Sequence, residues 1–487
     1  MKGFRMRLVA ALIVALATLA GSASGAHAQL WFSPAQRVLF SGRTPAEVRA
    51  RLAAHADSVL AHAPGDAGES FGWIGESQMR SGHPDSARAA YAHAYALTEE
   101  PAFACGLAEA LLASRRPADA ESAARFVAAL PADEPDAAHA ESRLWRTWAH
   151  ARLAGAQATR DELDAARAEL LAPGTPLDRR ERWTRRLAPL WLEAHVDAWP
   201  LLLELAVLSR GHDPALLLQA REASMGRPGG ESFERVLAAG IARRDSLSTR
   251  AWRAAGGRPL AVRGADGAAL GAWLFPVAAP HAPLLALLAE PDPAPGAGPD
   301  SLVAQLQRDG IAVALLDPRG SGRSAIAGCA LADDWSGRED ALTATTGRDL
   351  LALVKTVVAA GRMDPARIAV GAVGPGALAA ARAGHPGPLV LIDAVLAPTD
   401  RGPCIAALNA GGGPVYFQTG GGSVEGNWTV DAIAGRMRGP GPRVAESLAP
   451  GHGLALFRGG PKATQRLSSW LRDAWSKPRA TRPARPR

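Results

Sequence analysis

The sequence has 487 residues, a length that predicts about two to four domains and leaves room for a sizeable hydrophobic core. Hydrophobic residues make up 48% of the chain, charged residues 21% and aromatic residues 5%, which excludes a disordered chain and a polytopic membrane protein. The net charge of +7 comes from the two ends, because residues 1–8 carry three cations and residues 477–487 carry five. The remainder is close to neutral, so we expect no nucleic-acid partner.

Residues 1–28 have the pattern of a secretory signal peptide. The cations of the first eight residues precede an apolar run over residues 8–20, and the Ala-His-Ala sequence at residues 26–28 fits an A-x-A cleavage site. A membrane anchor is the alternative interpretation, but the apolar run is shorter than the ~20 residues that span a bilayer. We therefore expect cleavage after Ala28, a secreted or periplasmic protein, and contact with the membrane only during export.

Residues 29–255 are predicted to form a helical domain with internal repeats. The stretch from Glu76 to Ala87 aligns with the stretch from Glu109 to Ala120 at an offset of 33 residues, and both contain a proline at the same place. Residues 145–170 form a third, less regular unit. This spacing resembles the tetratricopeptide repeat of 34 residues. An irregular Ala-rich helical bundle is the alternative. Helical repeats of this kind imply a protein or peptide partner.

Residues 256–475 show short apolar runs that alternate with helical patterns, and residues 476–487 form a basic, Pro-rich tail that we expect to be disordered. The predicted strands are residues 259–262, 270–275, 284–289, 312–317, 367–372, 389–393 and 415–418. The predicted helices are residues 300–309, 341–361, 376–383, 430–437 and 462–475. This alternation predicts an α/β domain, in which helices flank both faces of a mostly parallel sheet.

Four motifs in this region resemble the α/β-hydrolase superfamily, especially its acetylxylan-esterase-like and prolyl-oligopeptidase-like members. They are the Asp-Gly hairpin of residues 266–276, the D-x-R-G-x-G-x-S loop of residues 317–324, the D-P-x-R-I-x-V strand of residues 363–370, and the Pro-Gly-His-Gly loop of residues 450–453. A generic Rossmann-like sheet is the alternative. The resemblance implies an α/β-hydrolase fold with a catalytic Ser, His and acid.

The nucleophile position of this resemblance is degenerate. The turn that should read G-x-S-x-G reads Ala-Val-Gly-Pro-Gly, which places Gly374 where the family has its serine. The next residue, Pro375, has no backbone N–H to donate to an oxyanion. The second oxyanion donor should follow the third strand, where this chain has Glu290, a carboxylate that would oppose a developing negative charge.

Only the histidine of the triad remains at its expected place. The resemblance places Ser423 at the acid position, with Glu425 and Asp431 as possible substitutes, and His452 at the histidine position. Because an imidazole without a nucleophile has no serine-hydrolase role, the sequence predicts a non-catalytic binding or scaffold protein.

Two alternatives remain open. In one, the chain is an active serine esterase or peptidase that uses His452 as a base and a displaced nucleophile among Ser321, Ser324 and Ser423. In the other, the cleft binds a small ester or glycan without turnover. We expect Arg319 and Ser321 to order their own loop.

The cysteines and the remaining motifs give weaker signals. Export permits a disulfide, and Cys329 and Cys404 are the favoured pair because both fall within residues 256–475, which leaves Cys105 unpaired. No H-E-x-x-H, C-x-x-C or P-loop sequence is present, so we expect no metal and no cofactor.

Overall fold

The computed structural model describes most of the chain beyond the predicted signal peptide. The described residues are 33–39, 41–42, 44–113, 116–128, 139–172, 175, 177–208, 214–225, 232–290, 300–326, 338–361, 363–420, 424–438, 442–447, 453–457 and 461–476. Within them, no helix combines the length and the apolar character needed to cross a membrane.

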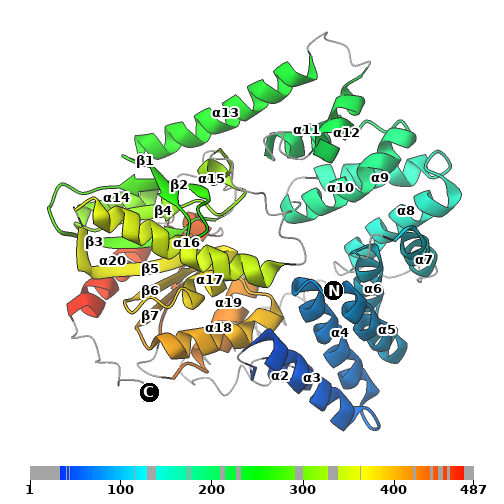
Figure 1. Ribbon diagram of the computed structural model, residues 1–487, viewed down its shortest axis with the longest axis horizontal. Helices are drawn as coiled ribbons and strands as arrows, with labels where there is room; N and C mark the ends of the chain where they lie inside the picture. The colour runs from blue at the N-terminus through cyan, green and yellow to red at the C-terminus, as the bar shows by residue number, and fades with distance from the viewer. Residues whose placement is uncertain are drawn as a thin grey trace, which may run out of the picture.

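Helices alone make up the first half of the described chain, where they form an arc beside the sheet (Figure 1). They are α2 (Pro34–Leu39), α3 (Pro45–Val59), α4 (Pro64–Arg80), α5 (Pro84–Thr98), α6 (Pro101–Ala113), α7 (Pro117–Ala128), α8 (His139–Ala154), α9 (Arg160–Leu171), α10 (Leu177–Glu193), α11 (Trp199–Leu208), α12 (Pro214–Ser224) and α13 (Phe233–Ala254).

The two self-similar stretches occupy equivalent places in this arc. Each covers the end of one helix, a short turn and the start of the next helix, α4 to α5 in the first copy and α6 to α7 in the second. Pro84 and Pro117 both begin their second helix, where a missing N–H costs nothing. Residues 145–170 likewise span α8, a turn at Gly155 with φ of 92°, and α9. The assignment to the tetratricopeptide family stays a prediction.

Tryptophans form the centre of the helical core. Trp145, Trp183 and Trp191 are fully buried, and the rings of Trp145 and Trp183 lie edge to face with centroids 5.1 Å apart. The Arg186 guanidinium lies 4.3 Å from the centre of the Trp145 ring and also pairs with Glu109 at 3.0 Å. These tryptophans are therefore packing residues.

The second half of the chain contains one eight-stranded sheet. Its strands are β1 (Arg258–Arg263), β2 (Ala269–Phe275), β3 (Ala282–Leu288), β4 (Ala312–Leu316), β5 (Met363–Val373), β6 (Leu389–Ile392), β7 (Val415–Gly420) and β8 (Arg443–Ser447). Their order is β1-β2-β4-β3-β5-β6-β7-β8. The pairings of β2 with β1 and with β4 are antiparallel, and all the others are parallel.

Two hydrophobic cores cover the two faces of this sheet. One is formed with α16 (Glu339–Ala359), α17 (Ala377–Arg382), α18 (Pro398–Gly411) and α19 (Val424–Ala434), and the other with α14 (Asp300–Arg308) and α20 (Pro461–Ser476). The shorter segments are α15 (Gly322–Ile326), η3 (Gly374–Gly376) and η4 (Gly453–Phe457). The predicted fold class, a helical array followed by a mostly parallel α/β sheet, is confirmed.

The strand β8 and the helix α18 are among the elements that differ from the sequence-based expectation. The strand β8 was not predicted, because its five residues include Arg443, Glu446 and Ser447 and lack an apolar run. The helix α18 was not predicted either, because it contains Gly402 and Pro403. A Cβ at Gly402 would collide with the backbone at the end of α2, so close packing of the two helices explains this glycine.

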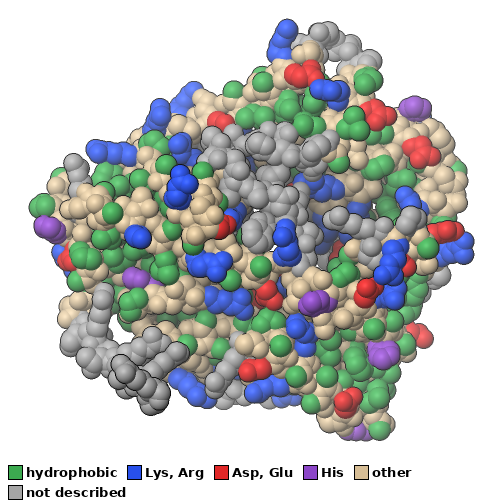
Figure 2. All heavy atoms as spheres, in the orientation of Figure 1, with side chains coloured by type: hydrophobic (Ala, Val, Ile, Leu, Met, Phe, Trp, Pro, Cys, Tyr) green, Lys and Arg blue, Asp and Glu red, His purple; other side chains and the backbone are tan. Residues whose placement is uncertain are grey.

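The helical array meets the α/β sheet through its first helices. α2, α3 and α4 all contact α18, whereas the long helix α13 leads directly into β1 (Figure 1). On the face drawn in Figure 2, Lys and Arg side chains lie among Asp and Glu side chains over both parts of the molecule.

Candidate functional site

The turn after β5 has the geometry of a nucleophile elbow without a nucleophile. β5 ends at Val373, the three-residue turn η3 covers Gly374, Pro375 and Gly376, and α17 follows at once. Gly374 has φ of 64°, in the left-handed region that favours glycine, and a Cβ at this position would have no atom within 4 Å. The turn therefore has room for a side chain, but neither Gly374 nor Pro375 supplies the hydroxyl or the N–H that acyl transfer needs.

Glu290 lies beside this elbow. It follows β3, and its carboxylate packs so closely against Gly453 that a Cβ on that glycine would collide with it. The same Cβ would lie 3.1 Å from the Cγ1 atom of Val373, the last residue of β5. The Glu290 carboxylate therefore lies against Gly453, next to the end of β5, and its place near an oxyanion position stays a prediction.

Asp393 is the buried carboxylate that contacts the same loop. It follows β6 directly, is 3% exposed and has φ of 50°. Its Oδ2 atom accepts a hydrogen bond of 2.8 Å from the backbone N–H of Gly453, the residue after His452. Asp393 is the last residue of the predicted strand 389–393, and the sequence predicts no role for it. The signal that could have found it is a carboxylate immediately after a buried strand, at the carboxyl edge of a parallel sheet.

Most of the triad positions expected from the resemblance fall outside the part of the chain that the structure describes, so the expected triad stays a prediction. His452, Ser423 and the side chain of Glu425 lie outside the described residues. Asp431 lies on α19 and is exposed. Among the described acidic side chains, Asp393 is the one that bonds to the residue beside His452.

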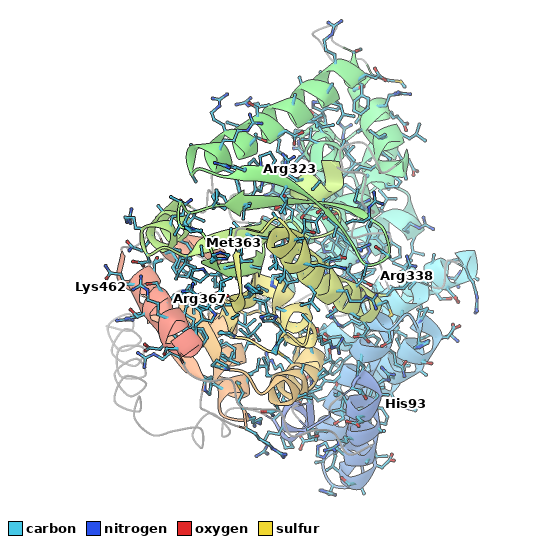
Figure 3. The ribbon with its side chains drawn as sticks, turned by 60° about the vertical axis from the view of Figure 1, so that its left-hand side comes forward. His93, Arg323, Arg338, Met363, Arg367 and Lys462 are labelled. Carbon is cyan, nitrogen blue, oxygen red and sulfur yellow. The ribbon has the colours of Figure 1, made fainter. Side chains whose placement is uncertain are left out.

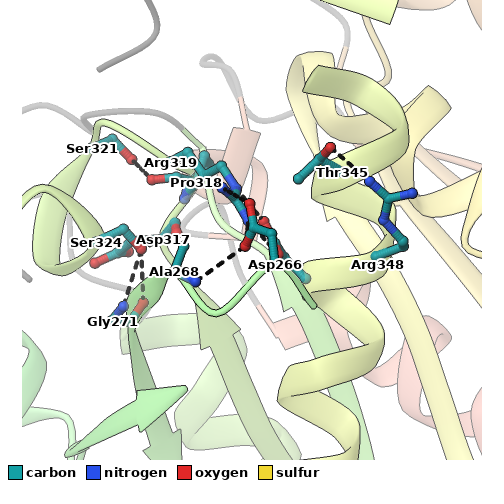
Figure 4. Close-up of polar contacts among 11 residues, drawn as sticks. Asp266, Ala268, Gly271, Asp317, Pro318, Arg319, Ser321, Ser324, Thr345 and Arg348 are labelled. Atoms are coloured by element: carbon teal, nitrogen blue, oxygen red, sulfur yellow. Dashed lines mark hydrogen bonds and ion pairs between the residues drawn. The ribbon is translucent and has the colours of Figure 1, made fainter. Parts of the chain in front are cut away.

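The loop after β4 is held by an ionic cluster centred on Arg319 (Figure 4). The Arg319 guanidinium pairs with Asp266 at 2.8 Å and with Asp349 at 2.6 Å, and the Arg319 and Asp349 side chains are almost fully buried. Hydrogen bonds from Arg319 hold the pKa of Asp266 at about 2, and the two carboxylates raise the pKa of Arg319 further above its usual value.

Both serines of this loop are bound within it. The Ser321 hydroxyl donates to the carbonyl oxygen of Pro318 at 2.9 Å. The fully buried Ser324 hydroxyl donates to the carbonyl oxygen of Asp317 at 2.6 Å and accepts from the N–H of Gly271 at 3.1 Å (Figure 4). These bonds tie both hydroxyls to backbone groups, which agrees with the expectation that Ser321 orders its own loop.

The favoured disulfide between Cys329 and Cys404 is not formed. Cys404 is a free thiol that α18 places in the hydrophobic core, while Cys329 lies outside the described residues. Burial raises the pKa of the Cys404 thiol to about 12, so this thiol is also a poor nucleophile. Cys105, on α6, is in no disulfide either.

An ionic contact fixes the helical array to the carboxyl side of the sheet. Arg80, the last residue of α4, pairs with Asp400 of α18 at 2.7 Å, and the adjacent Ser81 hydroxyl donates to Asp340 of α16 at 3.1 Å. Glu76 lies one turn earlier on α4, where burial raises its pKa to about 7. Burial also raises the pKa of Asp400. The helical array therefore joins the sheet through partly desolvated charges.

The described residues contain no group of three or more His, Cys, Asp or Glu side chains that could hold a metal ion. The arrangement around Gly374 thus consists of an open glycine, a proline and two carboxylates, Glu290 and Asp393. Among these described groups, none is a hydroxyl, thiol or amine that could act as a nucleophile.

The antiparallel first hairpin, the strand order and the strand–turn–helix at Gly374 define an α/β-hydrolase-type fold for the second half of the chain. No protein-family model matches the sequence, and no curated protein matches it significantly.

Solved structures similar to the chain are hydrolases. A prolyl endopeptidase matches 45% of this chain at 12% identity and a TM-score of 0.35, and a puromycin hydrolase matches 47% at 16% identity and 0.36. An esterase from Pyrococcus furiosus matches 46% of this chain at 14% identity and a TM-score of 0.36. The match covers 95% of the esterase. This chain covers only 38% of the prolyl endopeptidase and 40% of the puromycin hydrolase.

Proposed function

We propose that this protein is an exported, non-catalytic binding or scaffold protein, in which an α/β-hydrolase-type domain has lost its chemistry and the helical array binds a protein or peptide partner. The observation that carries this proposal is the pair Gly374 and Pro375 at the elbow. Together they remove the nucleophile and one oxyanion donor at a turn whose backbone geometry is otherwise retained.

The energetic consequence of this pair is large. Loss of a triad nucleophile lowers turnover by about 10⁶-fold, and loss of an oxyanion donor by about 10²–10³-fold. Glu290 adds a negative charge beside the elbow, where an oxyanion would need positive or N–H groups. These three features oppose turnover, which supports a role in binding a partner segment, a small ester or a glycan.

The far part of the helical array has features of a partner surface. Its first helices, α2 to α4, are already packed on α18. Further along, Leu218 of α12 is 66% exposed, and Met225, the residue that follows α12, is 71% exposed. These two large apolar side chains, exposed near each other in the sequence, support α12 and its carboxyl end as the place where a protein partner binds.

A crosslinking pull-down from the envelope of the exporting cell tests this partner surface. We expect the mature chain to capture a specific protein. A double variant that carries Leu218→Glu and Met225→Glu should no longer capture it. Leu60→Glu, at an exposed leucine beside α3, is the matched control and should retain capture. If the double variant captured the partner as well as Leu60→Glu does, the assignment of the partner surface to α12 would be wrong.

Export is part of this proposal and depends on residues 1–28. Expression of the full chain in a bacterium should yield a mature protein that begins at Gln29, in the periplasm or the medium. Detection of the uncleaved chain in the membrane fraction would instead support the membrane anchor.

The loss of chemistry is tested with a fluorophosphonate probe and p-nitrophenyl acetate, applied to the purified mature protein and to its His452→Ala variant. We expect no labelling and no turnover by either. The bond from Gly453 to Asp393 favours one alternative, in which that carboxylate orients His452 for an active hydrolase with Ser423 as the displaced nucleophile. Labelling and turnover that disappear in His452→Ala would establish that alternative.

A further inference from the structure

A groove lies between the last strand of the sheet and the last helix, away from the elbow. It has a volume of about 540 Å³ and lies between β8 and α20. Its lining residues are Arg443, Lys462, Gln465, Arg466, Ser469, Trp470 and Asp473. Lys462, Arg466, Ser469 and Asp473 follow each other at spacings of three and four residues, so they form one exposed side of α20. Figure 3 shows Lys462 on the outside of this helix.

The groove carries three cations and one acidic residue. Arg443 and Arg466 lie close enough to the buried Tyr416 that their charges act on its hydroxyl, although burial still raises the pKa of Tyr416 to about 12. Tyr416 also supports the wall of the groove, because its ring lies 5.2 Å from the ring of Trp470. The groove is therefore cationic and lies beside a half-exposed tryptophan. This combination suits an acidic ligand.

One side of the groove is an open edge of the sheet. β8 pairs only with β7 among the described strands, so its outer backbone N–H and C=O groups have no strand partner there. The opposite edge strand, β1, contains Pro259, which cannot donate to a further strand, whereas β8 has no proline. β8 is thus the edge that can accept another strand.

The two faces of β8 set different requirements for such a strand. Arg443 and Ala445 point to the face that α20 covers, since Arg443 lines the groove and Ala445 packs in the same core as Leu467. Val444 points to the opposite face and is 42% exposed. An added strand would meet cations on one face and an exposed valine on the other.

We propose that β8 and the adjoining groove bind an extended acidic segment of a partner protein, which adds to the sheet as a further strand. Its acidic side chains face Arg443, Lys462 and Arg466, and the alternate apolar side chains pack beside Val444. Backbone hydrogen bonds to β8 provide affinity, and the charges select the sequence.

The chain itself does not supply this segment from its ends, because residues 1–8 and 477–487 are both cationic. Two copies paired through β8 would bring two cationic grooves together, which like-charge repulsion opposes. An acidic partner is the occupant that the charges favour. This inference does not depend on whether the elbow is catalytic.

Fluorescence anisotropy with a labelled peptide of alternating valine and glutamate tests the proposal on the full mature chain. We expect binding that weakens as salt is added. Charge reversal by Arg443→Glu or Lys462→Glu should weaken binding by about tenfold or more. Arg258→Glu, an exposed cation on the other edge strand, is the matched control and should bind like the unmodified protein.

Two altered peptides separate the parts of the proposal. A peptide with lysine in place of glutamate should not bind, and the glutamate peptide with alternate backbone nitrogens methylated should bind at least about tenfold more weakly, because it cannot pair with β8. Equal binding of the methylated peptide would overturn strand addition. Equal binding of the lysine peptide, or no binding of the glutamate peptide, would overturn the acidic ligand.

Discussion

The carboxylate of Asp393 accepts a hydrogen bond of 2.8 Å from the backbone N–H of Gly453, across 60 residues of sequence. This bond joins the end of β6 to the loop that carries His452. It is buried, and Asp393 takes a left-handed backbone conformation to make it. The contact fixes Gly453 next to Val373, the residue before the turn at Gly374.

Removal of this acceptor should destabilise the α/β domain. We expect Asp393→Ala to lower the free energy of unfolding by about 1–3 kcal/mol, because the buried N–H of Gly453 loses its acceptor. Urea unfolding followed by tryptophan fluorescence measures the change. Asp57→Ala, at an exposed aspartate of α3, should change stability by less than about 0.5 kcal/mol. Equal effects of the two variants would mean that the Asp393 bond contributes nothing.

Restoring the hydroxyl at the elbow should not restore activity. A serine at residue 374 fits, because a Cβ there has no atom within 4 Å. The left-handed conformation should cost about 1–2 kcal/mol in Gly374→Ser and equally in Gly374→Ala. Since Pro375 still supplies no N–H, we expect Gly374→Ser to show no turnover of p-nitrophenyl acetate above the Gly374→Ala level. Turnover by the serine variant alone would show that the remaining machinery is intact.

The glycine in the middle of β5 should tolerate no side chain. A Cβ at Gly371 would overlap the carbonyl oxygen of Val390 on β6. We expect Gly371→Ala to cost about 2–3 kcal/mol of unfolding free energy, since strand backbone must move. Gly65→Ala, in the first turn of α4 with open space around it, should be neutral or stabilising by about 0.5 kcal/mol. Thermal unfolding of both variants checks the difference.

The Arg319 cluster should be sensitive both to mutation and to acid. Arg319→Met leaves the buried Asp349 without its cation, so we expect a loss of about 3–5 kcal/mol, against less than about 0.5 kcal/mol for the exposed Arg308→Met. Because the pKa of Asp266 is held at about 2, below its usual 3.8, its stabilising contribution is present above pH 4 and declines as the pH falls towards 2. Asp266→Asn should remove that part of the acid sensitivity in urea titrations.

The junction around Glu76 should respond to pH in the opposite direction. The pKa of Glu76 is raised from 4.5 to about 7, so the folded protein holds this proton more tightly than the unfolded chain. Its ionisation therefore lowers stability as the pH rises from 4.5 through 7. We expect Glu76→Gln to increase the unfolding free energy at pH 8 by about 1–3 kcal/mol and to have little effect at pH 4.5. Glu222→Gln, at an exposed glutamate of α12, should show no such difference.

Several elements of the fold follow from local sequence patterns. The apolar runs that predicted strands over residues 284–289 and 312–317 lie in β3 and β4, where every residue except Pro283 is buried. α18 escaped prediction because its helix-breaking residues are offset by packing against α2, which local propensity does not contain. β8 escaped prediction because an edge strand with one exposed face needs little apolar sequence.

The lack of a hydroxyl at residue 374 and of an N–H at residue 375 was determined by the sequence alone, because a glycine has no side chain and a proline has no N–H in any fold. The tertiary structure decided what surrounds that turn. Only the order of the strands in the sheet brings Glu290 and Asp393 to Gly453. Only the packing of α18 buries the Cys404 thiol in the core, where it forms no disulfide. Such contacts join residues distant in the chain, so they depend on how the strands are ordered, which no local pattern contains.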